Sequence, residues 1–317
     1  MLRMITATLW QRVSRLPIKS LFVTSSQKRS RLIASWLFPL PAVLVVLVMM
    51  AYPVGYTVWL SLHDLSPFNL NDPEWVGTEN YSGLLDDTRF HAALKRTVSF
   101  TAGAVTLQLL LGVGMALLFN HDFKGRGLVR TLFLLPMVAT PVAMSLIWLL
   151  ILNPVDGVAN WALKLVGFSP QLWLNSADTV IPTLVLMDTW QWSPLIMLMV
   201  LAGMSVLPLE PFEAAAIDGA SRWQSFRLIM LPLLRPTIMV ALLFRSIDCL
   251  KTFDIIYGTT QGGPGFASET LNLYIYKTSF DYFRLGYAAA ALVVFFTIVL
   301  GVSLLLIVLR RRAEAGL

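Results

Sequence analysis

The sequence predicts an all-α polytopic membrane protein with six transmembrane helices. Of its 317 residues, 56% are hydrophobic and only 13% are charged, whereas soluble domains carry about 25% charged residues. The mean hydropathy is +0.70. The apolar residues gather in segments long enough to cross a bilayer, which requires about 20 residues of helix.

Six apolar segments reach this length, and each is predicted to be one span. They are Trp36–Ser61, Thr97–Asn120, Thr131–Leu152, Val180–Val206, Thr237–Tyr257 and Gly286–Leu309. The first is too long, and too rich in large residues near its end, to be a cleaved signal peptide, so we interpret it as a retained span. The chain then divides into a basic tail over 1–35, a transmembrane domain over 36–309 and a short tail over 310–317. Prolines fall within or beside several spans, and kinked helices suit a transporter or channel better than a passive anchor.

Lys and Arg residues are divided unequally between the two sides of these spans. Sixteen lie in the two tails and in the 120–130 and 207–236 loops, and six lie in the other loops. Because cytoplasmic loops carry the excess, both termini and the 207–236 loop are predicted to be cytoplasmic. The net charge of +6 is therefore assigned to orientation in a lipid bilayer and not to nucleic-acid binding. The stretch ITATLWQRVSRL could lie on the membrane as an amphipathic helix, but a disordered tail that sets the topology is preferred.

Motifs of catalysis are missing from the sequence. It contains no GxxxxGK[ST], HExxH or GxSxG pattern, so it offers no nucleotide-binding loop, zinc protease site or nucleophile elbow. The three histidines are far apart, and Cys249 has no second cysteine to pair with. An intramembrane enzyme is therefore unsupported, and no catalytic or metal-binding residue is predicted.

A polar insert, EAAAIDGASRWQSFRLIMLPLLRP, separates the last two spans from the rest of the chain at 213–236. Pro211 and the neighbouring acids suit the first turn of a helix, and Gly219 suits its end. Ser221 and Gln224 then match a capping box that starts a second helix. We expect a helix–turn–helix on the cytoplasmic face, which either only connects two spans or binds another surface through its small alanines.

The insert resembles the EAA signature of permease subunits of binding-protein-dependent ABC importers. Glu-Ala-Ala is followed by Gly219 and by the Ile-x-Leu-Pro ending at Pro232, before the last two spans. The resemblance extends over nearly the whole chain. The segments 75–101, 124–154 and 244–280 look like the carbohydrate branch related to the larger subunit of the maltose permease, although the large extra outer domain of that subunit is absent.

This resemblance implies a type I ABC importer permease fold in a bacterial cytoplasmic (inner) membrane. The insert is then a coupling helix that sits in a cleft of a cytoplasmic ATPase. The residues expected at that contact are Glu213, Ala214, Ala215, Asp218 and Gly219. The chain would be non-catalytic and carry no cofactor, with ATP and Mg²⁺ on two copies of the ATPase. The other implied partners are a second, related permease subunit, an extracytoplasmic solute-binding protein and a carbohydrate or polyol.

Charged residues recur at three-residue intervals in the predicted fifth span, where charges are costly and usually face partners or water. They are Arg245, Asp248, Lys251 and Asp254. The spacing predicts Arg245–Asp248 and Lys251–Asp254 pairs along one helix. These residues either line the translocation pathway or only pair locally and set the position of the helix.

A second polar and aromatic cluster lies in the predicted fourth span. Its members are Asp188, Trp190, Gln191 and Trp192. Aromatic rings and hydrogen-bonding groups together suit a sugar, so this cluster is a candidate part of the substrate pathway. The alternative is a kinked packing segment before Pro194.

Three rival functions remain from the residues alone. An ion-coupled secondary transporter of small solutes would need no ATPase partner. A polytopic enzyme would need a clustered nucleophile, base or metal site, which the sequence lacks. A scaffold that only anchors an ATPase does not account for the charged fifth span.

Overall fold

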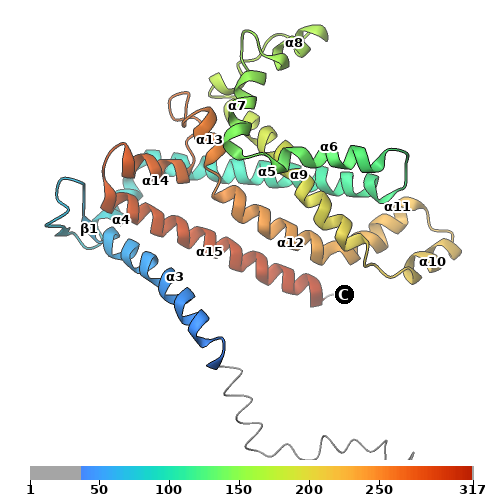
Figure 1. Cartoon of the computed structure of the whole chain (residues 1–317), viewed down its shortest axis with the longest axis horizontal. Coiled ribbons are helices and arrows are strands. Elements are labelled where there is room, and N and C mark those ends of the chain that lie inside the picture. The colour runs from blue at the N-terminus through green and yellow to red at the C-terminus, as the bar shows by residue number, and fades with distance from the viewer. Residues whose placement is uncertain (1–36, 316–317) are drawn as a thin grey trace, which may run out of the picture. The chain divides into compact units, whose positions relative to one another are not determined.

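The computed structural model describes residues 37–315 (Figure 1). The predictions for the tail 1–35 lie outside the described residues. The chain forms two units, Met1–Tyr56 and Thr57–Leu317, and the boundary between them falls within the first predicted span.

Helix α3, Leu40–Ser61, runs through the boundary between the units. Its apolar side chains are exposed on every side, including Val43 at 52%, Leu47 at 60% and Met49 at 72%. A helix that is apolar all round and exposes most of its side chains in the described part of the chain suits a lipid environment. The structure therefore confirms a helix of spanning length at this position.

The segment between α3 and the next long helix contains a short strand pair and a short helix. Strands β1, His63–Asp64, and β2, Glu74–Trp75, pair antiparallel, and helix α4, Glu79–Asp86, follows. Asn80 ties α4 to the loop, because its side-chain amide donates to the carbonyls of Ser61 and His63 at 3.0 Å each.

Helix α5, Thr88–Asn120, begins well before the predicted start at Thr97. Asp87 caps it, accepting hydrogen bonds from the backbone N–H groups of Arg89 (2.8 Å) and Phe90 (3.1 Å). The hydroxyl of Tyr274 also donates to this carboxylate at 2.5 Å. Burial alone raises the pKa of Asp87, but these hydrogen bonds outweigh it and hold the pKa below its ordinary value. The polar N-terminal end of α5 is thus helical although it is not apolar.

The third predicted span is broken into two helices. Helix α6, Arg126–Val138, and helix α7, Pro141–Ile151, meet at 103°. The predicted third span, Thr131–Leu152, is therefore not one straight helix, although the two helices together can still count as one span. Thr140 adopts extended backbone, because the ring of the following proline disfavours the helical conformation in the residue before it.

The segment after α7 is organised by one buried asparagine. Helix α8, Val158–Leu165, is followed by a 3₁₀ turn, Trp173–Asn175. Asn160 donates to the carbonyls of Pro154 and Gln171 and accepts from the indole N–H of Trp173 at 2.8 Å. This side chain holds together both ends of the loop between α7 and α9.

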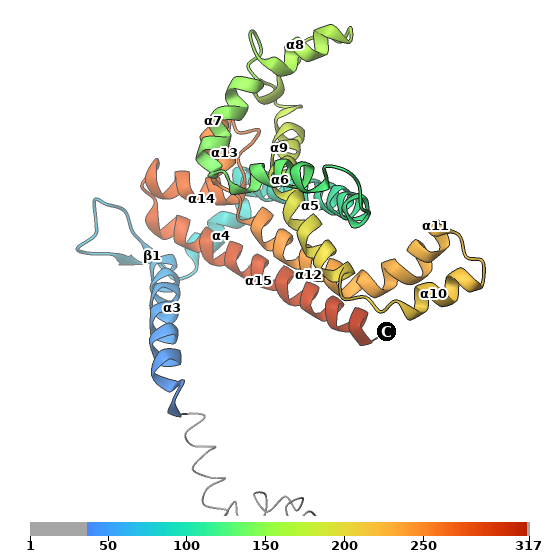
Figure 2. The same ribbon diagram turned by 45° about the vertical axis from the view of Figure 1, so that its right-hand side comes forward.

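Helix α9, Val180–Met204, packs against α5, and the two helices are adjacent in both views (Figures 1 and 2). Gly112 of α5 permits this approach. A Cβ at this glycine would lie 2.6 Å from the side chain of Ile196 and 3.1 Å from the carbonyl oxygen of Ser193. Small residues at helix contacts are typical of membrane proteins.

The predicted helix–turn–helix is present, but its second helix does not stop at the membrane surface. Helix α10, Glu210–Ile217, turns into α11, Arg222–Ser225. A π-helical turn, Phe226–Met230, then leads into α12, Leu231–Leu250. Residues 222–250 form one helix of 29 residues. Pro232 and Pro236 lie inside this helix, so the predicted fifth span, which began at Thr237, started too late.

A short break in the chain follows α12. Helix α13, Asp254–Thr259, begins after a break at Lys251–Phe253, so the predicted fifth span to Tyr257 was wrong at its outer end. Helices α14, Leu271–Phe280, and α15, Leu285–Ala315, complete the unit, with α12 beside α15.

Five helices of the described part are long and apolar enough to span a membrane, and six if α6 and α7 together count as one. This agrees with the predicted number. The buried core between α5, α9 and α13 includes Phe100, Leu184, Met187 and Ile256. It supports the polar residues described next.

Candidate functional site

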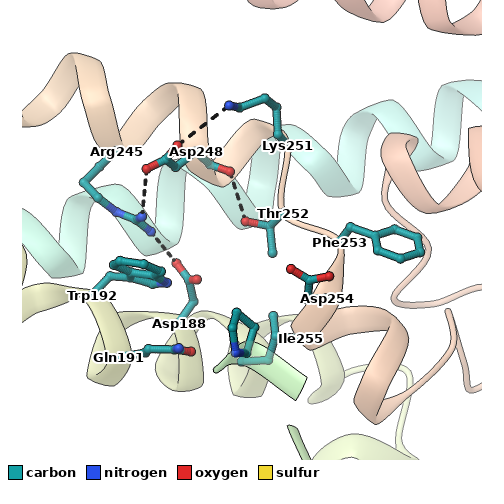
Figure 3. A pocket seen from close by; sticks show the side chains of 11 residues that line it. Asp188, Gln191, Trp192, Arg245, Asp248, Lys251, Thr252, Phe253, Asp254 and Ile255 are labelled. Carbon is teal, nitrogen blue, oxygen red and sulfur yellow. Dashed lines mark hydrogen bonds and ion pairs between the residues drawn. The ribbon is translucent and has the colours of Figure 1, made fainter. Parts of the chain in front are cut away.

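A polar cavity of about 290 Å³ lies where α9, the end of α12 and the starts of α7 and α13 meet (Figure 3). Its lining joins the two clusters that the sequence predicted separately. The lining residues are Pro141, Asp188, Gln191, Trp192, Arg245, Asp248, Lys251, Thr252, Phe253, Asp254 and Ile255. The last four of these belong to the break after α12 and to the first turn of the next helix, α13.

A buried charge network forms the floor of the cavity. The Arg245 guanidinium, 1% exposed, lies 3.0 Å from a carboxylate oxygen of Asp188 and donates to the Gln108 side-chain oxygen at 2.8 Å. Gln108 in turn donates to the same Asp188 oxygen at 2.6 Å. The Trp192 ring lies 4.9 Å from the guanidinium carbon. Each charge at membrane depth is thus compensated, as the cost of burying it requires.

The upper part of the cavity is more open. Asp248 lies 3.5 Å from Arg245 and 3.8 Å from the Lys251 ammonium, and its side chain is 49% exposed. The predicted Arg245–Asp248 pair is present, although Asp188 is the closer partner of Arg245. The predicted Lys251–Asp254 pair is wrong: within residues 37–315 no ion pair joins them. Three-residue spacing brings side chains together only within one helix, and α12 ends before Lys251.

Two groups facing the cavity lack partners inside the described part of the chain. Gln191 is 2% exposed, and its side-chain nitrogen donates no hydrogen bond to any described residue. Asp254 points toward the cavity in Figure 3 without an ion pair to its carboxylate. Buried amides usually have partners, so Gln191 is an unmet donor at this site.

Trp190 does not join the other members of the predicted cluster. Its ring packs edge-on against Trp148 at 5.4 Å, and it lines a separate, apolar cavity of about 610 Å³. Successive helical residues turn by about 100°, so the Asp188 and Trp192 side chains share a face of α9 whereas Trp190 faces away. Sequence proximity misled the prediction, and helical periodicity would have separated them.

The α10–α11 turn has the local structure that the sequence predicted. Gly219 has a φ of +74°, the left-handed conformation expected after a helix end. The Ser221 hydroxyl accepts from the Gln224 N–H at 3.3 Å, and the Gln224 side chain accepts from the Ser221 N–H at 2.7 Å. The capping box is therefore complete.

Four of the five residues expected at a partner contact are exposed, and one is not. Glu213, Ala214, Asp218 and Gly219 are exposed. Ala215 is only 9% exposed. Ile217, which the prediction omitted, is 86% exposed. It lies three and four positions after Ala214 and Glu213, on the same helical face, and this spacing was the signal that could have identified it.

Comparison with known proteins identifies the chain's family. Residues 108–314 match the family described as "Binding-protein-dependent transport system inner membrane component". This match covers α9, the α10–α11 turn, α12 and the polar cavity. The chain belongs to this family. It is therefore a multi-pass permease component of an ABC importer in the inner membrane.

Individual relatives of this permease match almost end to end. The trehalose/maltose transport system permease protein MalF of Thermococcus litoralis is 37% identical over 289 residues, covering 91% of this chain and 96% of the relative. The sulfoquinovosyl glycerol transport system permease protein SmoG of Agrobacterium fabrum is 36% identical, covering 81% and 84%. A solved bacterial ABC transporter involved in import of the acidic polysaccharide alginate has a chain 25% identical, with a TM-score of 0.75, covering 90% and 97%.

Proposed function

We propose that this permease translocates a sugar or related polyol that an extracytoplasmic binding protein delivers. The observation that carries the proposal is the cavity beside Arg245, which combines charged, amide and indole groups at the end of a membrane helix. Polar groups and aromatic rings together suit a hydroxylated ligand. The names of the permease's relatives, which include trehalose/maltose and sulfoquinovosyl glycerol transport, support the same class.

The driving reaction belongs to other chains in this proposal. Two copies of a cytoplasmic ABC ATPase hold ATP and Mg²⁺, and this permease holds no cofactor. A second, related permease subunit completes the pathway. The proposed contact surface for the ATPase is the exposed side of the α10–α11 turn: Glu213, Ala214, Asp218 and Gly219, with Ile217 added and Ala215 packed behind it.

One continuous helix connects this surface to the cavity. It starts at Arg222, directly after the turn, and ends at Leu250, next to Lys251 of the cavity lining. At about 1.5 Å per residue, its 29 residues extend about 43 Å. Movement of the turn when the ATPase subunits close is thereby carried to Arg245 and Asp248. Family membership likewise favours ATP-driven import over the ion-coupled transporter considered from the sequence.

Replacing Gly219 by valine tests the coupling role of the turn. The added Cβ meets no atom within 4 Å, but a branched residue at a φ of +74° is strained. The turn should change its backbone while the membrane helices stay intact. We expect stimulation of the assembled transporter's ATPase by the sugar-loaded binding protein to fall about tenfold, within the usual range of coupling energies.

Gly167→Val is the matched control. Gly167 has a φ of +83°, and its Cβ would also meet nothing within 4 Å, but it lies in the outer loop after α8. This variant carries the same backbone strain away from the proposed ATPase contact and should keep wild-type stimulation. Equal losses in both variants, or full stimulation in Gly219→Val, would refute the coupling role.

A further inference from the structure

The charges of the cavity do not balance. Three carboxylates line it, on Asp188, Asp248 and Asp254, against two cations, on Arg245 and Lys251. Arg245 is held by Asp188 and Gln108 on the floor. Lys251 has Asp248 as its neighbour at 3.8 Å. Counted as ionised, these five side chains sum to a charge of −1, and each cation already has a carboxylate neighbour.

The groups without protein partners can bind a hydroxyl group. The buried Gln191 nitrogen has no acceptor among the described residues, and the exposed Asp254 carboxylate has no protein donor, so a ligand hydroxyl that reaches it replaces water. A hydroxyl group supplies both functions at once, whereas an ionised carboxylate or sulfonate supplies only acceptors. An anionic ligand could satisfy Gln191 but would leave Asp254 facing a like charge.

We infer that this cavity selects an uncharged polyhydroxylated ligand and rejects anionic sugars, with Asp254 as the residue that determines this selectivity. The inference rests on the proposed function, because it assumes that a sugar reaches the cavity. Family membership does not supply it, since the relatives include proteins named for transport of trehalose/maltose, sulfoquinovosyl glycerol and acidic alginate. The selectivity between neutral and anionic ligands is therefore attributed to the cavity residues of this chain.

Gln191 contributes affinity and Asp254 contributes discrimination. Asp254 is on the exposed rim, where an arriving ligand meets it first, and Gln191 lies deeper on α9. Placing like charges together at a binding site disfavours the wrong ligand strongly. We therefore expect an anionic sugar to bind at least about tenfold more weakly than its neutral counterpart.

The experiment measures binding to the permease without its binding protein, which has a selectivity of its own. The permease is assembled with its partner subunits in lipid nanodiscs, and binding of radiolabelled trehalose is measured without nucleotide. Competitors are unlabelled trehalose, a derivative with one primary alcohol oxidised to a carboxylate, and a derivative with one hydroxyl replaced by an amine. The variants are Asp254→Asn, Gln191→Leu and the control Asp178→Asn, an exposed acid outside the cavity.

The inference predicts a different result for each variant. In the wild type and in Asp178→Asn, trehalose should compete at least about tenfold better than the carboxylate. Asp254→Asn should narrow this ratio to within about threefold, because an amide removes the like charge. Gln191→Leu should weaken trehalose binding without lowering thermal stability, because it removes a buried donor that has no protein partner. A purely structural Gln191 would instead lose stability.

Failure of the inference can be told apart from failure of the proposed function. Equal competition by trehalose and the carboxylate, or an unchanged ratio in Asp254→Asn, overturns the inference while a sugar pathway stands. Preference for the amine over trehalose also overturns it, by assigning the site to a cationic ligand. If no probe binds and the complete transporter takes up no sugar with ATP, the proposed function falls and the inference falls with it.

Discussion

Arg245 is among the largest side chains buried completely in this permease. Its guanidinium depends on Asp188 at 3.0 Å, on Gln108 at 2.8 Å and on a more distant Asp248 at 3.5 Å. A buried ion pair contributes little net stability when intact, because both ions lose their water. Removing one partner is costly, since the remaining charge stays buried without compensation.

Asp188→Ala should therefore destabilise the permease by about 3–5 kcal/mol. The variant leaves the guanidinium of Arg245 buried with only an amide and a half-exposed carboxylate nearby. Thermal unfolding of the purified protein in detergent, followed by loss of monodisperse protein, measures the effect.

Asp248→Ala is the matched control for this prediction. It removes another carboxylate that contacts Arg245, but one whose side chain is 49% exposed. An exposed pair contributes about 0–1 kcal/mol, so this variant should remain close to wild type. Similar losses in the two variants would contradict the assignment of Asp188 as the principal partner.

Sequence spacing could identify some of these contacts and not others. The Arg245–Asp248 pair follows from three-residue spacing on one helix. The Arg245–Asp188 pair could not be predicted, because the two residues belong to different helices and spacing along the chain gives no distance between helices. The unmet donor of Gln191 was equally invisible, since it depends on what surrounds the side chain after folding.

At the scale of helices, two glycines of α5 two residues apart, Gly112 and Gly114, differ in how closely they approach α9. A Cβ at Gly112 would lie 2.6 Å from Ile196, whereas a Cβ at Gly114 would meet nothing within 4 Å. Gly112→Ala should separate the two helices and cost about 1–3 kcal/mol, as expected for overpacking. Thermal unfolding in detergent provides the measurement.

Gly114→Ala should change the stability in the opposite direction. Alanine is a better helix former than glycine, and the position has room for it, so stability should rise by about 0.4–1 kcal/mol. The two substitutions are chemically identical and lie two residues apart on α5. A change in stability in the same direction for both variants would show that helix propensity, and not the close approach to α9, controls this segment.

The residue preferences near helix ends predicted some boundaries correctly and others incorrectly. The end of α10 at Gly219 and the capping box at Ser221 involve residues adjacent in sequence, so propensity suffices. The continuous helix from Arg222 to Leu250 was missed because the predicted fifth span began at Thr237, after Pro232 and Pro236. A membrane helix tolerates such prolines when a π-helical turn accommodates them.

Across the whole chain, hydropathy located the spans because a bilayer demands about 20 apolar residues for each. It could not give their pairing, since lipid-facing and protein-facing surfaces use similar residues. It also could not foresee the 103° bend between α6 and α7. The orientation of the permease rests on the distribution of Lys and Arg and stays a prediction.

Cysteine labelling tests that orientation on the whole molecule. Cys249 is the one cysteine of the sequence and is 1% exposed, so the native chain should give little background with a membrane-impermeant maleimide. Asp178→Cys, in the segment before α9, should label in intact spheroplasts. Ala216→Cys, on the exposed side of α10, should label only after the membrane is disrupted.

The two positions are joined by α9, a helix long enough to cross the membrane once, so they must lie on opposite sides if that helix spans. Labelling of both from outside would therefore exclude α9 as a span. The reversed pattern, with Ala216→Cys reactive in intact spheroplasts, would show that the protein has the opposite orientation to the predicted one. It would also place the α10–α11 turn beyond the reach of a cytoplasmic ATPase, and the coupling role of Gly219 would have to be abandoned.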